Sequence, residues 1–166
     1  QFKNGMMGMG VLGFEEVNMS QSIKQHTTGS RSASASTLVK TPGVTSEGSS
    51  TILLEQGSVS TTIKAGDVFT VSGSNAVNPQ TRESTGSLFQ FVALADATAS
   101  SGTWTVTVAA MYSAAHALAT VDVLPATGAT VTFVGAASTQ YAQNLVYHKD
   151  AITFATADLL LPQGVD

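Results

Sequence analysis

Residues 64–73 read KAGDVFTVSG, and this stretch decides the fold class. Gly66 offers the positive φ that a tight turn before a strand needs. The residues after Asp67 are mostly β-branched or aromatic, and apolar and polar side chains largely alternate, as in a strand with one buried face. We therefore predict a turn followed by a β-strand over residues 67–72.

Further strands are predicted on both sides of this one. Each is rich in β-branched or aromatic residues and is bounded by turn residues, such as the Ser-Ser-Gly that precedes Thr103. They cover residues 59–63, 88–92, 103–108 and 130–134. The pattern predicts a small antiparallel β-barrel or sandwich over residues 41–136. We expect one or two helical turns in the alanine-rich residues 111–119.

The two flanks, residues 1–40 and 137–166, have no obvious core of their own. The Gly- and Met-rich residues 5–13 are expected to form a close-packed loop or a hinge. Residues 152–159 alternate and predict a strand, which ends before Pro162. A compact β unit between two such flanks is the layout of an inserted domain.

Composition favours a structural or binding protein. Hydrophobic residues make up 43% of the 166 residues, enough for one core, whereas charged residues make up only 11%, against about 25% in an average domain. A surface poor in charge suits packing against other copies. The net charge of -4 disfavours nucleic-acid binding, no apolar run approaches the length of a membrane span, and the absence of cysteine excludes disulfides and thiolate zinc sites.

No catalytic, cofactor-binding or metal-binding residue is predicted, and we expect the protein not to be an enzyme. The three histidines lack metal-ligand spacing, and no serine has the glycine pattern of a nucleophile elbow. Residues 8–13 fit GxGxxG but are not flanked by a strand and a helix, and two acids follow them. Trp104 is assigned to the core or its rim. The histidines are His26, His116 and His148.

Three blocks of sequence are informative when they are read together. The first block is LGFEEVNMSQ (12–21) with HTTG (26–29). The second is residues 64–73 with AVNPQTR (76–82) and LFQFV (88–92), and the third is NLVYHKDA (144–151) with ATADL (155–159) and Pro162. In this order the blocks resemble the major coat protein family of tailed phages, in particular the short-tailed class whose shell subunit carries an inserted β domain. In the first block, Glu15 replaces the family's usual acid, and residues 22–24 depart from its Asn-Leu-Pro.

The resemblance implies a central-to-C-terminal fragment of a coat subunit. Residues 1–40 and 137–166 would be parts of an α/β Johnson-fold shell domain, and residues 41–136 an inserted β-barrel. It also implies assembly into pentamers and hexamers of an icosahedral head that encloses DNA, in the host cytoplasm, with scaffolding and portal proteins as partners. It implies no cofactor, no membrane and no specific nucleic-acid site in this region.

Residues 73–86 are predicted to be an inter-subunit contact loop, because an exposed loop with both signs of charge in a charge-poor protein suits specific pairing. A solvated turn is the other interpretation. An alternative function is a carbohydrate-binding or adhesin-like module, which should expose several aromatics, whereas only one Trp and three Tyr are present. The candidate contact residues are Asn75, Asn78, Gln80, Arg82 and Glu83.

Overall fold

The structure is a computed structural model of the chain. It describes residues 6–11, 14–18, 21–31, 36–57, 60–147, 151 and 155. The chain divides into two compact units, one of residues 1–24 with 143–166 and the other of residues 25–142. The described residues form strands and no helix, which confirms the mainly β prediction. Accordingly, no helix that could cross a bilayer is found among them.

The described part of the first unit is a hairpin. β1 (Met6–Val11) pairs with β2 (Phe14–Asn18) in an antiparallel ladder. The expected loop or hinge is therefore wrong for residues 6–11, because pairing with a neighbouring strand outweighs the low strand propensity of a Gly-Met sequence. The GxGxxG pattern leads into strand β2 instead of a helix. Residues 148–150 and most of the strand predicted over 152–159 lie outside the described residues.

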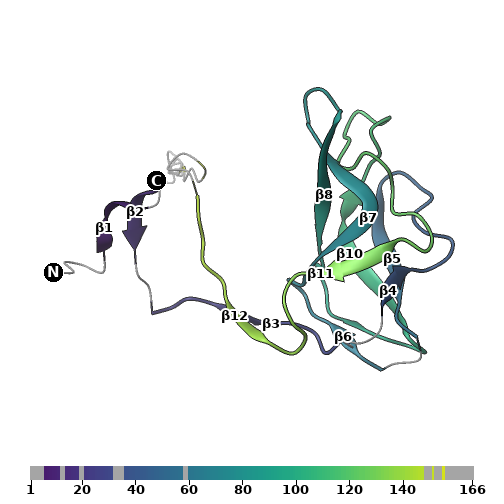
Figure 1. Cartoon of the computed structure of the whole chain (residues 1–166), viewed down its shortest axis with the longest axis horizontal. Coiled ribbons are helices and arrows are strands. Elements are labelled where there is room, and N and C mark those ends of the chain that lie inside the picture. The colour runs from purple at the N-terminus through teal and green to yellow at the C-terminus, as the bar shows by residue number, and fades with distance from the viewer. Residues whose placement is uncertain are drawn as a thin grey trace, which may run out of the picture. The chain divides into compact units, whose positions relative to one another are not determined.

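The second unit is built on a six-stranded antiparallel sheet that curls into a half-barrel (Figure 1). The strand order is β10-β5-β4-β11-β7-β8. A hydrogen bond from Leu94 N to Thr107 O, 2.8 Å long, joins the end of β8 to β10 and brings the two edges together there. The strands are β4 (Thr37–Val39), β5 (Ser49–Glu55), β7 (Val68–Val77), β8 (Ser84–Val92), β10 (Thr103–Met111) and β11 (Thr130–Phe133).

Two short ribbons complete this unit. β6 (Thr62–Ile63) pairs with β9 (Ala97–Thr98), and β3 (Gln25–Thr27) pairs with β12 (Gln140–Ala142). The second ribbon joins the residues at which the unit begins to those at which it ends.

Four of the five predicted strands are confirmed as β7, β8, β10 and β11; the first three are longer than predicted, and β11 is one residue shorter. Gly66 and Gly102 have the positive φ expected of them, 96° and 75°. Of the strand predicted over residues 59–63, only Thr62 and Ile63 are in a strand. The expected helical turns in residues 111–119 are wrong. Hydrogen bonds between Tyr112 and Thr120 close this segment into a loop, so its backbone forms turns instead.

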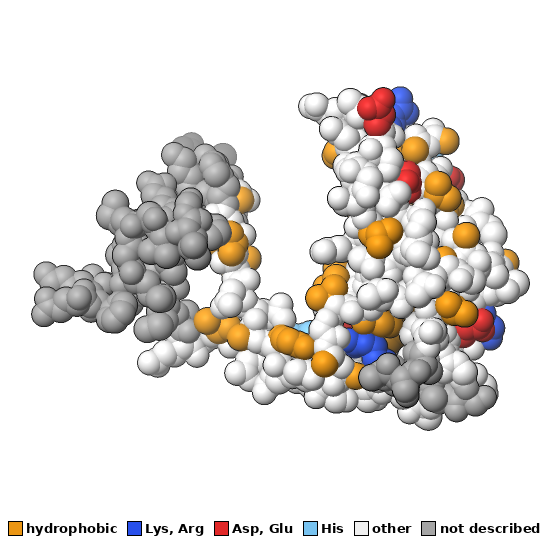
Figure 2. Space-filling view, in the orientation of Figure 1, with side chains coloured by type: hydrophobic (Ala, Val, Ile, Leu, Met, Phe, Trp, Pro, Cys, Tyr) orange, Lys and Arg blue, Asp and Glu red, His pale blue; other side chains and the backbone are white. Residues whose placement is uncertain are grey.

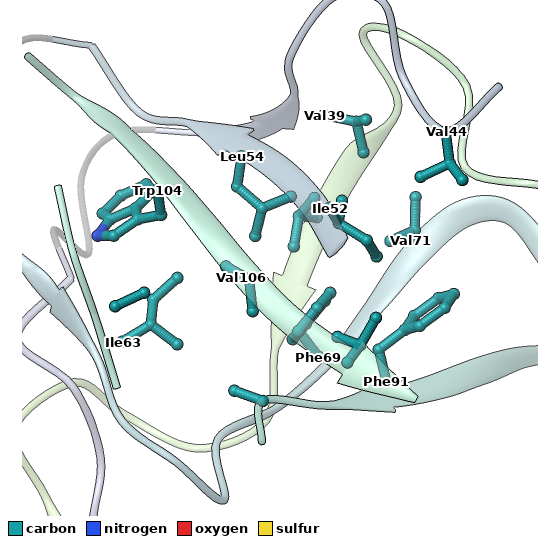
Figure 3. Close-up of a cluster of buried hydrophobic side chains, with 14 of the residues drawn as sticks. Val39, Val44, Ile52, Leu54, Ile63, Phe69, Val71, Phe91, Trp104 and Val106 are labelled. Carbon is teal, nitrogen blue, oxygen red and sulfur yellow. The ribbon is translucent and has the colours of Figure 1, made fainter. Parts of the chain in front are cut away.

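Inward-facing side chains of the sheet form one hydrophobic core (Figure 3). Phe69 stacks on Phe91 with ring centroids 5.6 Å apart and also contacts Phe133. Trp104 is fully buried and its indole N–H donates to Thr61 O at 3.0 Å, which confirms its assignment to the core. Other buried members are Val39, Ile52, Leu54, Ile63, Val71, Val106, Val108, Met111 and Val121.

Candidate interaction site

The hairpin of β7 and β8 ends in an exposed tip, residues 78–83 (Figure 1). Its backbone is closed by hydrogen bonds from Asn78 N to Glu83 O (2.9 Å) and from Arg82 N to Asn78 O (2.8 Å). The Asn78 side chain accepts a bond from Gln80 N at 2.9 Å, as in an Asx turn. The tip is therefore held in shape by its own hydrogen bonds.

Four of the five predicted contact residues lie in this tip with exposed side chains: Asn78, Gln80, Arg82 and Glu83. Figure 2 shows one basic and one acidic side chain together at the end of the hairpin. Within the described part of the chain, neither Arg82 nor Glu83 forms an ion pair. Arg82 has a φ of 60°, a left-handed conformation that costs a non-glycine residue about 1–2 kcal/mol. Both charges remain free to contact another molecule.

The fifth predicted residue, Asn75, lies within β7 and anchors the hairpin. Asp122 accepts hydrogen bonds from Asn75 N (2.6 Å), Asn75 Nδ2 (2.8 Å) and Ser84 Oγ (3.1 Å), and also from Val123 N (2.7 Å). Burial alone would raise the pKa of Asp122, but these bonds from Asn75, Val123 and Ser84 outweigh it and lower the pKa below its ordinary value. Asp122 thus ties both strands of the hairpin to the loop that follows β10.

A second cluster, which is buried, is centred on Asp67 in the turn before β7. Its carboxylate is almost fully buried and accepts hydrogen bonds from Gly29 N and Lys64 N, each at 3.0 Å. His26 Nε2 lies 2.8 Å from Oδ1, and an Arg31 guanidinium nitrogen lies 3.4 Å from Oδ2. One carboxylate therefore binds the turn and the segment 25–31.

Arg31 extends this cluster to the segment that leaves the half-barrel. Its guanidinium donates to Gly135 O at 2.9 Å and lies 4.4 Å from the centroid of the Phe133 ring. Burial lowers the pKa of Arg31, against the opposing effect of Asp67. Thr28 Oγ1 also donates to Ala136 O at 2.6 Å. The segments before and after the half-barrel are thus fastened to it and to each other.

Sequence reasoning missed both carboxylates as structural centres. Asp67 was predicted only to stand where the turn meets the strand, and the partners of its side chain, His26, Gly29 and Arg31, are 36–41 positions away in the chain. No local pattern marks contacts over such distances. Among the described residues, no group of three or more His, Asp or Glu is arranged to hold a metal ion. The Asp122 cluster supports the hairpin of β7 and β8. The Asp67 cluster supports the base of the unit, meaning the segments 25–31 and 133–136 and the turn before β7.

Comparison with known families identifies a matching family. The family model described as P22 coat protein - gene protein 5 matches residues 1–165, nearly the whole chain. No curated protein matches the chain.

Proposed function

Because the chain belongs to the P22 coat protein family, whose members are structural capsid proteins and not enzymes, we propose that it assembles with copies of itself into an icosahedral head shell that encloses phage DNA. The match over residues 1–165 carries this proposal. It also confirms the resemblance to major capsid proteins of short-tailed phages.

The finer parts of the proposal follow from the same membership. The subunits form pentamers and hexamers, with scaffolding and portal proteins as partners during assembly in the host cytoplasm. Residues 41–136 serve as an inserted β domain between two parts of a Johnson-fold shell domain. The compactness of residues 25–142, with their own core, supports an insert of about this extent.

We assign the inter-subunit contact to the hairpin tip. Its two charges are exposed and unpaired within the described residues, and its shape is fixed by internal hydrogen bonds. A preorganised charged loop loses little conformational entropy on binding. In addition, Arg82 occupies a conformation in which glycine would be less strained, and such local strain is typical of functional positions.

The test is charge reversal in the complete gene product, with particles counted by negative-stain electron microscopy. Arg82→Glu should reduce shell formation strongly and leave Trp104 fluorescence and the urea midpoint unchanged, because the side chain is exposed. Lys24→Glu alters the net charge equally at an exposed residue outside the half-barrel and serves as the control. Normal shells from Arg82→Glu would rule out the tip as a contact.

The carbohydrate-binding alternative gains no support from the structure. Trp104 is buried in the core, and Tyr112 stacks on His116 with centroids 4.4 Å apart. Neither ring is presented as a platform for a sugar. Of the other two tyrosines, Tyr141 is 37% exposed and its hydroxyl accepts a bond from Ala136 N, and Tyr147 is 60% exposed.

A further inference from the structure

Residues 25–31, here called the strap, are held by the segment through which the chain leaves the half-barrel, residues 135–142. The first part of the strap, β3, pairs with β12 (Figure 1), and hydrogen bonds of 2.9–3.0 Å continue the contact beyond this ribbon. These bonds run from Thr28 N to Thr139 O, from Ser138 N to Gly29 O and from Arg31 to Gly135 O. The strap is therefore held in place while the entering and leaving segments lie side by side.

On its other side the strap covers Asp67. Among the described residues, the Asp67 carboxylate has four hydrogen-bond partners, of which Lys64 N, in the turn before β7, is the only one outside the strap. The backbone of the strap also lies directly against β6, because a Cβ on Gly29 would collide with the backbone oxygen of Thr62. The three partners within the strap are His26, Gly29 N and Arg31.

Withdrawal of the strap would leave Asp67 with most of its hydrogen bonds unmade. The side chain is only 1% exposed, and a buried carboxylate without partners is strongly disfavoured. The turn that carries Asp67 would then have to rearrange to bring the charge to water. β7 begins at the next residue, and its second residue, Phe69, is buried in the core. A change at the strap is therefore transmitted to the core.

The ribbon that closes the strap has little stability of its own. β3 and β12 form three residue pairs, and five of the six side chains are exposed. An isolated two-stranded ribbon is at best marginally stable in water. Closure of the strap thus depends on how close the chain holds residues 25 and 142 to each other.

We propose that the strap is a conformational device that couples the separation of residues 25 and 142 to the stability of the half-barrel. Ends that lie one strand spacing apart keep the strap on Asp67, whereas ends that are drawn apart withdraw it and loosen the turn before β7. The coupling is reciprocal, so loss of the Asp67 contacts favours separation of the ends. This inference concerns residues 25–142 by themselves and does not rest on the proposed function.

Two introduced cysteines and two cross-links of different length test the coupling. The chain has no cysteine, and Gln25 and Ala142 are exposed and directly opposed in the ribbon. In the full chain with Gln25→Cys and Ala142→Cys, a disulfide holds the ends at the spacing of the ribbon. A rigid phenylene bis-maleimide on the same two cysteines holds the ends further apart. Both cross-links close the same loop and constrain the unfolded chain alike, so each form is the matched control for the other.

We expect the urea midpoint, followed by Trp104 fluorescence, to be at least about 1 M lower with the bis-maleimide than with the disulfide. Under native conditions, the amides of Gly29 and Lys64, which donate to Asp67, should exchange at least about tenfold faster with the bis-maleimide. The amide of Asp122, which donates to Asn75 O at the anchor of the hairpin, should exchange at the same rate in both forms.

Equal midpoints, or equal exchange rates at Gly29 and Lys64, would overturn the coupling. Faster exchange that includes Asp122 to the same extent would show general strain from the linker, and would overturn a device centred on Asp67. Failure of the disulfide to form under mild oxidation would contradict the side-by-side ends from which the coupling starts.

Discussion

Replacing Asp67 with asparagine should destabilise the half-barrel strongly. The substitution preserves the size and shape of the side chain but removes the negative charge next to the buried guanidinium of Arg31. It also replaces one carboxylate oxygen by an NH2 group, which cannot accept a hydrogen bond. Both oxygens have hydrogen-bond partners, Oδ2 with Gly29 N as a donor, so one set of bonds is lost. Removing one partner of a buried ion pair typically costs about 3–5 kcal/mol.

Three interactions hold Arg31 in place without Asp67: its bond to Gly135 O, its contact with the Phe133 ring, and the packing of its stem. We therefore expect the lower end of that range, about 3 kcal/mol. Urea unfolding followed by the fluorescence of Trp104 reports on this unit alone, because it is the only tryptophan and lies in its core. With a urea slope of about 1–3 kcal/mol per molar, the midpoint should fall by about 1–3 M.

The control for Asp67 is Asp96→Asn. Asp96 forms an ion pair of 2.6 Å with Lys64, but both side chains are about half exposed, so water and salt screen the pair. Its substitution should hardly move the midpoint, and the small effect should vanish at high salt. A midpoint for Asp67→Asn that equals the control's would refute the claim that a buried carboxylate holds the base of the unit together.

Three other perturbations test the packing and the hairpin. Phe69→Ala should cost about 3–5 kcal/mol in the same unfolding assay, because it empties the centre of the aromatic cluster. Gly29→Ala should destabilise by at least about 1–3 kcal/mol, since its Cβ would collide with the backbone oxygen of Thr62; an unchanged midpoint would contradict this. The pKa of Asp122 is lowered in the folded state. The Asp122 carboxylate therefore stabilises the folded protein fully above its pKa in the unfolded chain, about 4, and this stabilisation is lost as the pH falls through its pKa in the folded protein. The stability gap between the unmodified protein and Asp122→Asn should accordingly narrow below about pH 5, whereas a constant gap would show that Asp122 is not a charged anchor.

The predictable part of the fold is the part that local physics encodes. The turn at Gly66 and the strand after it follow from backbone freedom and side-chain alternation, and both are present. β5 was missed because Ile52, Leu53 and Leu54 form an unbroken apolar run that does not alternate. The hairpin of β1 and β2 was missed because pairing, not composition, makes the Gly-Met sequence a strand.

The candidate site divides in the same way. The exposed tip was predictable from Asn78-Pro79 and the two adjacent charges, which indicate a turn on the surface. The Asp122 cluster that supports the tip was not predictable, because Asp122 bonds to Asn75 and Ser84 across 38–47 positions of the chain, with β8 and β10 between them. The Johnson fold of the flanks and the boundaries at residues 41 and 136 stay predictions.

The ribbon of β3 and β12 has a consequence for the evolution of such proteins. Thr27 lies opposite Gln140 in antiparallel register. The unit therefore begins and ends in two neighbouring strands, whose axes are about 5 Å apart. If residues 25–142 are an insert, as proposed, a host loop whose ends are separated by one strand spacing would accept or lose them without redirecting its own chain. The Asp67 cluster would move with the insert complete, because His26, Gly29 and Arg31 all lie inside it.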